Sequence, residues 1–253
     1  MGQHEKAVLE QVRLCMIRGF YSAVHLSVSE MDEIACLLRT ARDNDGKQTK
    51  FPDFVCDNGW IEHFETTFGK IDTCGGYENK RCDNAFVKGC VTQMLSVKPN
   101  ESGFIVRHVS NDLPVGSYDN FRVSYRRVWS KHIDSFRKSG IDLDTKNIGM
   151  FLMELDFRGV VVHCVDSKGQ LVRYPYNLMF DREFLDFIYD SRNIVKYLIV
   201  YSNFGVCEVL PLDRIPDLKQ QFPDDVQVRF DSVIGKQMYT LIGFNGGEND
   251  GEG

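Results

Sequence analysis

The dipeptide Asn58-Gly59 stands between two short segments of strand-forming residues, 53–56 and 60–66. Asn-Gly is the pair that a tight hairpin turn favours most, because both residues tolerate positive φ angles. The flanking segments are rich in aromatic and β-branched residues, which suit paired strands. This feature predicts an antiparallel hairpin, and it constrains the fold more than any other part of the chain.

Helical and strand patterns alternate around this hairpin. Apolar residues recur at helical spacing over residues 7–17 and 118–138, and Ser29 is the expected N-cap of another helix. Apolar runs predict further strands at residues 150–157, 160–165, 195–201 and 207–210, the first two joined as a hairpin through Arg158-Gly159. The alternation predicts a mixed α/β fold, with a central mixed sheet flanked by helices.

The composition fits one globular domain. The chain has 253 residues, of which 43% are hydrophobic and 26% charged, which is ordinary for a single packed core. We expect one domain over residues 1–243 and an acidic, glycine-rich, disordered tail over 244–253. No apolar run approaches the roughly 20 residues of a membrane span, and the N-terminus does not read as a secretory signal. We therefore expect no membrane association and a cytoplasmic location.

Asp53 and Glu62 are the strongest candidates for chemistry. They lie in apolar strands on opposite arms of the hairpin, so they can approach each other across it. Two facing carboxylates repel unless a cation lies between them, and a hard cation such as Mg²⁺ or Mn²⁺ prefers oxygen ligands. The alternative is that both acids face solvent or pair with lysines. The chain has no phosphate-binding glycine loop, dinucleotide fingerprint or nucleophile elbow.

The strings Phe51-Pro52-Asp53-Phe54 and Ile61-Glu62-His63-Phe64 carry a resemblance to a known family. A Pro-Asp on one strand and a Glu on the next, after a leading helix, resembles the PD-(D/E)XK nuclease superfamily. The two strings also look like a motif of uncharacterised bacterial proteins with restriction-endonuclease-like folds. The resemblance implies that fold and a magnesium-dependent hydrolase that cleaves phosphodiesters of nucleic acid, with the metal on Asp53 and Glu62.

The chain departs from the superfamily at one position. There, a lysine two residues after the Glu helps to activate water, but this chain has Phe64. Lys70 or Lys80, from the polar segment that follows, or His63 would have to replace it. Otherwise the chain has no catalytic lysine and is inactive.

Two further acids are weaker candidates. Glu10 lies on the leading helix, where the superfamily often supplies another acid, and Glu154 lies in the apolar strand at 150–157. Helical and strand patterning places each near a polar face. We expect both to face solvent.

The helix at 118–138 carries cations opposite its apolar stripe. A solvated surface is one interpretation, and a ridge that follows a nucleic-acid backbone is the other. The net charge of −6 argues against a protein whose whole surface coats nucleic acid, but not against a local basic groove. The candidate nucleic-acid-binding residues are Arg122, Arg126, Arg127, Lys131 and Lys138.

Two other functions remain open. The first is a non-catalytic protein of a phage-host conflict system, an immunity, inhibitor or sensor component that binds a protein partner. The absent lysine and the acidic net charge favour it. The second is a zinc module that combines His63 with Cys74, Cys82 and Cys90, although the cysteine spacing fits no common zinc motif.

Overall fold

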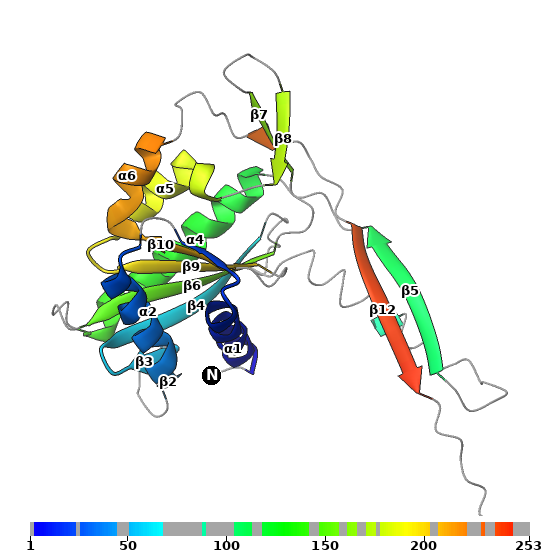
Figure 1. Ribbon diagram of the computed structural model, residues 1–253, viewed down its shortest axis with the longest axis horizontal. Helices are drawn as coiled ribbons and strands as arrows, with labels where there is room; N and C mark the ends of the chain where they lie inside the picture. Colours follow the sequence, from blue (N-terminus) through cyan, green and yellow to red (C-terminus); the bar gives the residue numbers. More distant parts are fainter. Residues whose placement is uncertain are drawn as a thin grey trace, which may run out of the picture.

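The computed structural model places a seven-stranded mixed sheet at the centre of the molecule, with strand order β1-β10-β9-β6-β4-β3-β2 (Figure 1). It describes residues 3–23, 26–44, 51–67, 88–89, 104–112, 118–141, 147–156, 161–165, 171–175, 178–202, 207–221, 229–230 and 236–244. The strands of this sheet are β1 (Tyr21–Ala23), β2 (Arg42–Asp43), β3 (Phe54–Cys56), β4 (Gly59–Thr67), β6 (Ile148–Asp156), β9 (Tyr197–Ser202) and β10 (Cys207–Pro211). The predicted mixed sheet flanked by helices is confirmed.

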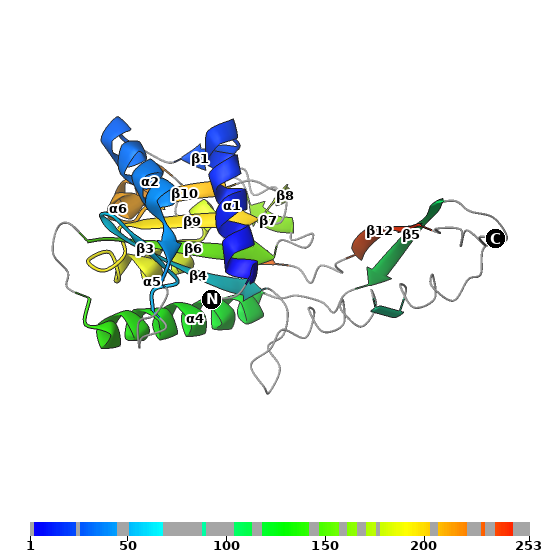
Figure 2. The ribbon, with the colours of Figure 1, turned by 90° about the horizontal axis from the view of Figure 1, so that it is seen from below.

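Helices cover both faces of the sheet. They are α1 (Gln3–Arg18), α2 (Val28–Thr40), α4 (Tyr118–Ser139), α5 (Arg182–Tyr189) and α6 (Ile215–Gln221), with 3₁₀ turns at Leu178–Phe180 and Leu212–Arg214. Helices α1 and α2 lie on one face and α4 on the other (Figure 2). Side chains of α4, α5 and α6 share the second face's core with Trp60, Phe64 and Phe151. The sheet therefore separates two apolar cores, and successive residues of one strand enter different cores.

The predicted hairpin is present as β3 and β4, which pair antiparallel with Cys56 opposite Gly59. The turn residues are Asp57 and Asn58, so Gly59 is already the first residue of β4. A Cβ at Gly59 would lie 2.1 Å from the carbonyl oxygen of Ile148. A glycine is needed here because the backbone of β6 comes so close to that of β4.

The predicted hairpin between residues 150–157 and 160–165 is wrong. β6 lies inside the central sheet, parallel to both β4 and β9. β7 (Val161–Val165) instead pairs with β8 (Leu171–Pro175) and β11 (Arg229–Phe230) in a separate three-stranded sheet. A strand covered by helices on both faces is apolar throughout, and a purely local pattern does not tell such a strand from a hairpin arm.

Helix boundaries differ from the prediction at one cap. Ser27, not Ser29, is the N-cap of α2. Its hydroxyl oxygen accepts a hydrogen bond from the backbone N–H of Glu30, whose carboxylate in turn accepts from the N–H of Ser27. This reciprocal capping box satisfies two N–H groups at the start of the helix, whereas a cap at Ser29 would leave them without partners.

A two-stranded sheet completes the described structure. β5 (Phe104–Asp112) pairs antiparallel with β12 (Lys236–Phe244), and Figure 1 draws this ribbon apart from the central sheet. Nearly all of the expected tail, residues 245–253, lies outside the described residues, and a single domain over 1–243 stays a prediction. Among the helices that the structure describes, none has the length and apolar character to cross a membrane.

Candidate functional site

Asp53 and Glu62, the acid pair, meet where β3 begins. Asp53 is the residue just before β3. Phe54 pairs with Ile61, so Asp53 and Glu62 are at the next position of the antiparallel hairpin. Its backbone N–H donates to Glu62 Oε2 at 2.8 Å, and the N–H of His63 donates to Asp53 Oδ2 at 2.9 Å. Each carboxylate thus accepts a backbone N–H from the opposite strand. These two cross-strand hydrogen bonds fix the orientation of both side chains.

Burial makes the acid pair difficult to ionise fully. Glu62 is 5% exposed, and burial raises its pKa to about 8. Burial, and next the negative charge of Glu62, raise the pKa of Asp53 to about 6. Within the described ranges, no lysine or arginine forms an ion pair with either carboxylate. A buried acid beside a half-buried one, without a full cationic partner, favours the entry of a proton or a metal ion.

His132, on α4, is a member of the site that sequence reasoning missed. Its Nδ1 lies 2.6 Å from Glu62 Oε1, and its ring stacks on Phe64 with centroids 5.1 Å apart. Burial lowers the pKa of His132 to about 4, so the ring is neutral at neutral pH. The only hint in the sequence was its place three residues after Trp129, beside the apolar stripe of the helix.

Phe64, at the position of the superfamily's lysine, is buried against Trp129 and Phe151. Among the described residues, Lys131 is the lysine whose charge acts on Glu62. Its positive charge lowers the pKa of Glu62, but burial has the larger effect and raises it. Lys131 was predicted only as a nucleic-acid contact. Lys70 and Lys80, the predicted replacements for the absent lysine, lie outside the described residues, as do Cys74, Cys82 and Cys90 of the zinc alternative.

A second group of side chains lies on the opposite face of β4. His4 on α1, His63 on β4 and Glu154 on β6 form a histidine–glutamate cluster whose three ligand atoms lie within 4.8 Å of one another. His4 Nε2 is 2.7 Å from Glu154 Oε2 and 3.0 Å from Glu65 Oε1. His63 Nε2 is 3.4 Å from Glu154 Oε2. Glu154, expected to face solvent, instead lies between two imidazoles.

The cluster holds Glu154 in its charged form. Burial raises the pKa of this carboxyl, but the nearby imidazoles of His63 and His4 outweigh that effect, and the pKa lies below its ordinary value. His63 therefore has two separate roles. Its backbone N–H supports Asp53, whereas its imidazole points to the other face of the sheet, away from His132.

Glu5, not Glu10, is the acid of α1 that acts on the pair. Glu10 is exposed and pairs with Arg13, as expected of a solvent-facing residue. The charge of Glu5 raises the pKa of Asp53, although less than burial and Glu62 do. Glu5 Oε2 is buried and makes no hydrogen bond in the structure. The negative charge that α1 adds near Asp53 therefore comes from a residue five positions before the predicted Glu10.

The predicted basic ridge on α4 is partly neutralised. Arg122 and Arg126 both form ion pairs with Glu183 of α5, and the guanidinium of Arg126 lies 5.0 Å from the centre of the Phe187 ring. These contacts make Arg122 and Arg126 less available to the phosphates of a nucleic acid. The other members of the predicted set, Arg127, Lys131 and Lys138, are exposed.

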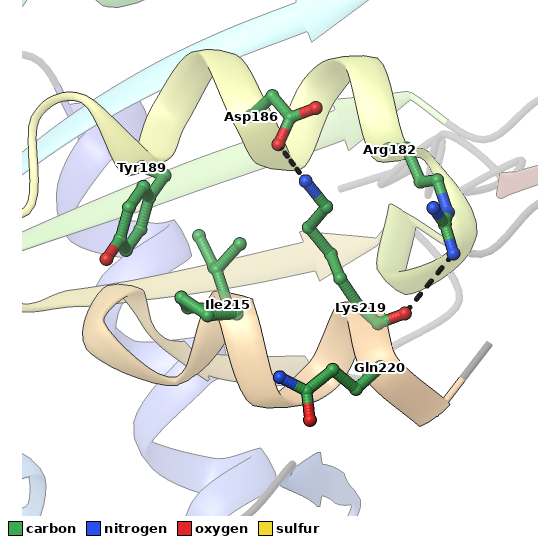
Figure 3. A pocket seen from close by; sticks show the side chains of 7 residues that line it. Arg182, Asp186, Tyr189, Ile215, Lys219 and Gln220 are labelled. Atoms are coloured by element: carbon green, nitrogen blue, oxygen red, sulfur yellow. Dashed lines mark hydrogen bonds and ion pairs between the residues drawn. The ribbon is translucent and has the colours of Figure 1, made fainter. Parts of the chain in front are cut away.

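A cavity of about 500 Å³ lies between α5 and α6 (Figure 3). Among its lining residues, Lys219 forms an ion pair with Asp186, and Arg182 donates to the carbonyl of Lys219 at 3.3 Å. The other side chains that line it include Tyr189 and Ile215. Because Lys219 and Asp186 neutralise each other and Arg182 is bonded to a backbone carbonyl, the cavity offers less chemistry than the acid pair.

The fold and the site define an α/β protein in which one strand of a mixed sheet carries an acid pair on one face and a histidine–glutamate cluster on the other. No family model, no curated protein and no solved structure matches the chain.

Proposed function

We propose that this protein is a metal-dependent nuclease that hydrolyses phosphodiester bonds at the acid pair. One observation carries the proposal. Two carboxylates on opposite arms of the hairpin, one buried and one half-buried, lie together with raised pKa values, and neither forms an ion pair with a lysine or arginine of the described chain. A divalent cation is the natural counter-charge for such a pair, and Mg²⁺ or Mn²⁺ suits its oxygen donors.

The residues present fit such an ion. Asp53 and Glu62 would hold it, and their orientation is fixed in advance because each accepts a backbone N–H from the other strand. When bound, such an ion would polarise the phosphodiester and lower the pKa of a nearby water molecule. This agrees with the resemblance to PD-(D/E)XK nucleases, which places the metal on the same two residues.

The neighbouring side chains have distinct roles in this proposal. His132 holds the second oxygen of Glu62 and fixes its rotamer. Lys131, exposed on the same helix, supplies positive charge near Glu62 in place of the lysine that Phe64 replaces. With Arg127 and Lys138, it would contact the phosphate backbone of the nucleic acid. Lys70 and Lys80 stay alternative replacements for the absent lysine, whereas the imidazole of His63 lies with His4 and Glu154 on the other face of the sheet.

Cleavage assays test the proposal. Labelled single- and double-stranded DNA and RNA would be incubated with Mg²⁺ or Mn²⁺ and with wild type, Asp53→Asn, Glu62→Gln or the control Glu10→Gln. The amide oxygens of Asn and Gln can still accept the backbone N–H bonds, so both variants should fold. We expect each to lose cleavage by at least about a hundredfold, as removal of a group that stabilises the transition state does, and Glu10→Gln to retain it.

Two results would contradict the proposal. Retained cleavage in Glu62→Gln would remove the acid pair from the chemistry. Absence of cleavage by wild type on every substrate, with no rise in melting temperature on addition of Mg²⁺ or Mn²⁺, would reject a metal-dependent enzyme. The second result would favour the non-catalytic component of a phage-host conflict system, and its protein partner would be sought next.

A further inference from the structure

The histidine–glutamate cluster has the composition of a transition-metal site. It combines two imidazoles with one carboxylate, drawn from α1, β4 and β6. Two histidines and one acid hold zinc in several catalytic sites and form the facial triad of non-haem iron sites. Imidazole prefers such borderline ions to Mg²⁺. The ligand set therefore differs in kind from the all-oxygen acid pair.

The distances fit one ion. Ligands at about 2.0–2.2 Å from a tetrahedral ion lie roughly 3.3 Å from one another. The separation between His63 Nε2 and Glu154 Oε2 is 3.4 Å. His4 is closer to Glu154, at 2.7 Å, but its side chain is 50% exposed on the first turn of α1 and can withdraw. His4 would have to move away from Glu154 to admit an ion, while all three ligand atoms already lie within 4.8 Å of one another.

A buried nitrogen without a hydrogen bond points to a missing ligand. The His63 side chain is 4% exposed, and its Nε2 makes no hydrogen bond although Glu154 lies nearby. Buried polar atoms are normally satisfied, so an exception needs an explanation. A metal ion bound by this nitrogen would supply it.

A fourth donor lies beside the cluster. Glu65 Oε1 is 3.0 Å from His4 Nε2, and its side chain is 25% exposed. Glu65 is two residues after His63 on β4, so both side chains are on the same face of the sheet. It can complete the coordination of a four-coordinate ion, or it can orient His4 from outside and leave that position open to water.

We propose that His4, His63 and Glu154 bind one borderline divalent transition-metal ion, with Zn²⁺ the best fit, at a site separate from the acid pair. The proposal does not rest on nuclease activity. The backbone of His63 contacts Asp53, but the three ligand side chains are on the α1 face and the Glu62 carboxylate faces α4. None of these side chains is therefore a ligand of both sites, and the histidine–glutamate cluster should bind its ion when the acid pair is empty.

Cobalt substitution and calorimetry test the site on the full chain. Metal-free protein would be titrated with Co²⁺ while the visible spectrum is recorded, and with Zn²⁺ in a calorimeter. The variants are His4→Ala and Glu154→Gln. The matched controls are His132→Gln, which alters a histidine outside the cluster, and Asp53→Asn, which alters the acid pair.

We expect one tightly bound equivalent of ion and visible Co²⁺ bands without a thiolate-to-cobalt charge-transfer band in wild type, since imidazole ligands hold such ions more tightly than the all-oxygen acid pair does. Affinity should fall at least tenfold in His4→Ala and Glu154→Gln, since even outer-sphere changes cost about 10–100-fold. Both controls should retain this tightly bound equivalent. Because His4 is half exposed, its alanine variant keeps the test valid if Glu154→Gln fails to fold.

Unchanged affinity in a folded His4→Ala protein would overturn the proposal, and so would a thiolate band, which would assign the ion to cysteines. Loss of binding in Asp53→Asn would show that the two sites are one. Each of these results is distinct from failure of the nuclease proposal, because none depends on cleavage.

Discussion

The substitution Glu62→Gln should weaken the pH dependence of stability in metal-free protein. In the unfolded chain this carboxyl titrates near its ordinary pKa of 4.5, whereas in the fold its pKa is about 8. Between these values the folded protein binds more protons than the unfolded chain. The free energy of unfolding of the wild type should therefore fall as the pH rises from about 4.5 to about 8.

The size of the effect follows from the same values. A tenfold change in proton affinity corresponds to about 1.4 kcal/mol, so a rise from 4.5 to about 8 corresponds to at most about 5 kcal/mol. Water entry and proton sharing with Asp53 reduce it, and we expect about 2–4 kcal/mol. In the Gln variant, the amide oxygen can accept from the N–H of Asp53, and the amide N–H can donate to the neutral Nδ1 of His132.

Urea denaturation at pH 5, 7 and 9 in the presence of a chelator measures this. The variant should lose less stability than wild type between pH 5 and 9, and should be the more stable of the two at pH 9. Equal pH dependence in both proteins would refute the reasoning, because it would mean that Glu62 titrates as a solvated acid. Asp53→Asn should show the same trend with a smaller amplitude, since the pKa of Asp53 is raised only to about 6.

Three further changes test other parts of the structure. Lys131→Ala should lower cleavage by about tenfold or more, as loss of a charge near the reacting groups does, whereas Lys138→Ala should change it less than the Lys131 variant does; equal effects would reject a special role for Lys131. Gly149→Ala places a Cβ 2.4 Å from Cζ2 of Trp60, and should cost about 3 kcal/mol and lower the melting temperature by roughly 10 °C; an unchanged melting curve would contradict the close packing there. Ser27→Ala removes the cap of α2 and should cost about 1 kcal/mol in urea unfolding, which a shift within error would disprove.

Sequence patterns correctly predicted the elements that depend on residues close together in the chain. Asn58 and Gly59 indicated the hairpin, and the stripe that includes Phe121, Trp129 and Ile133 indicated α4; all three of these side chains are buried. The proximity of Asp53 and Glu62 also followed from the hairpin, because the turn alone brings them together. Such features need no knowledge of distant parts of the chain.

Long-range contacts were not predictable in the same way. The register of β4 against β6 joins residues almost ninety positions apart, as in the pair Glu62 and Phe151, and no local signal distinguishes it from a hairpin between residues 150–157 and 160–165. The histidine–glutamate cluster also depends on contacts between residues that are far apart in the sequence. His4 and Glu154 are 150 positions apart, so no ligand spacing exists in the sequence, and only the packing of α1 on the sheet brings them together.

The alternation of β4 has an evolutionary consequence. Glu62 and His63 are consecutive, yet one faces α4 and the other α1. Insertion or deletion of a single residue before them would exchange the faces of both and destroy the two clusters together. Point substitutions, in contrast, can alter one cluster and leave the other intact. Descendants of this protein should therefore lose or change the two sites separately by substitution, while β3, the turn and β4 keep a fixed length.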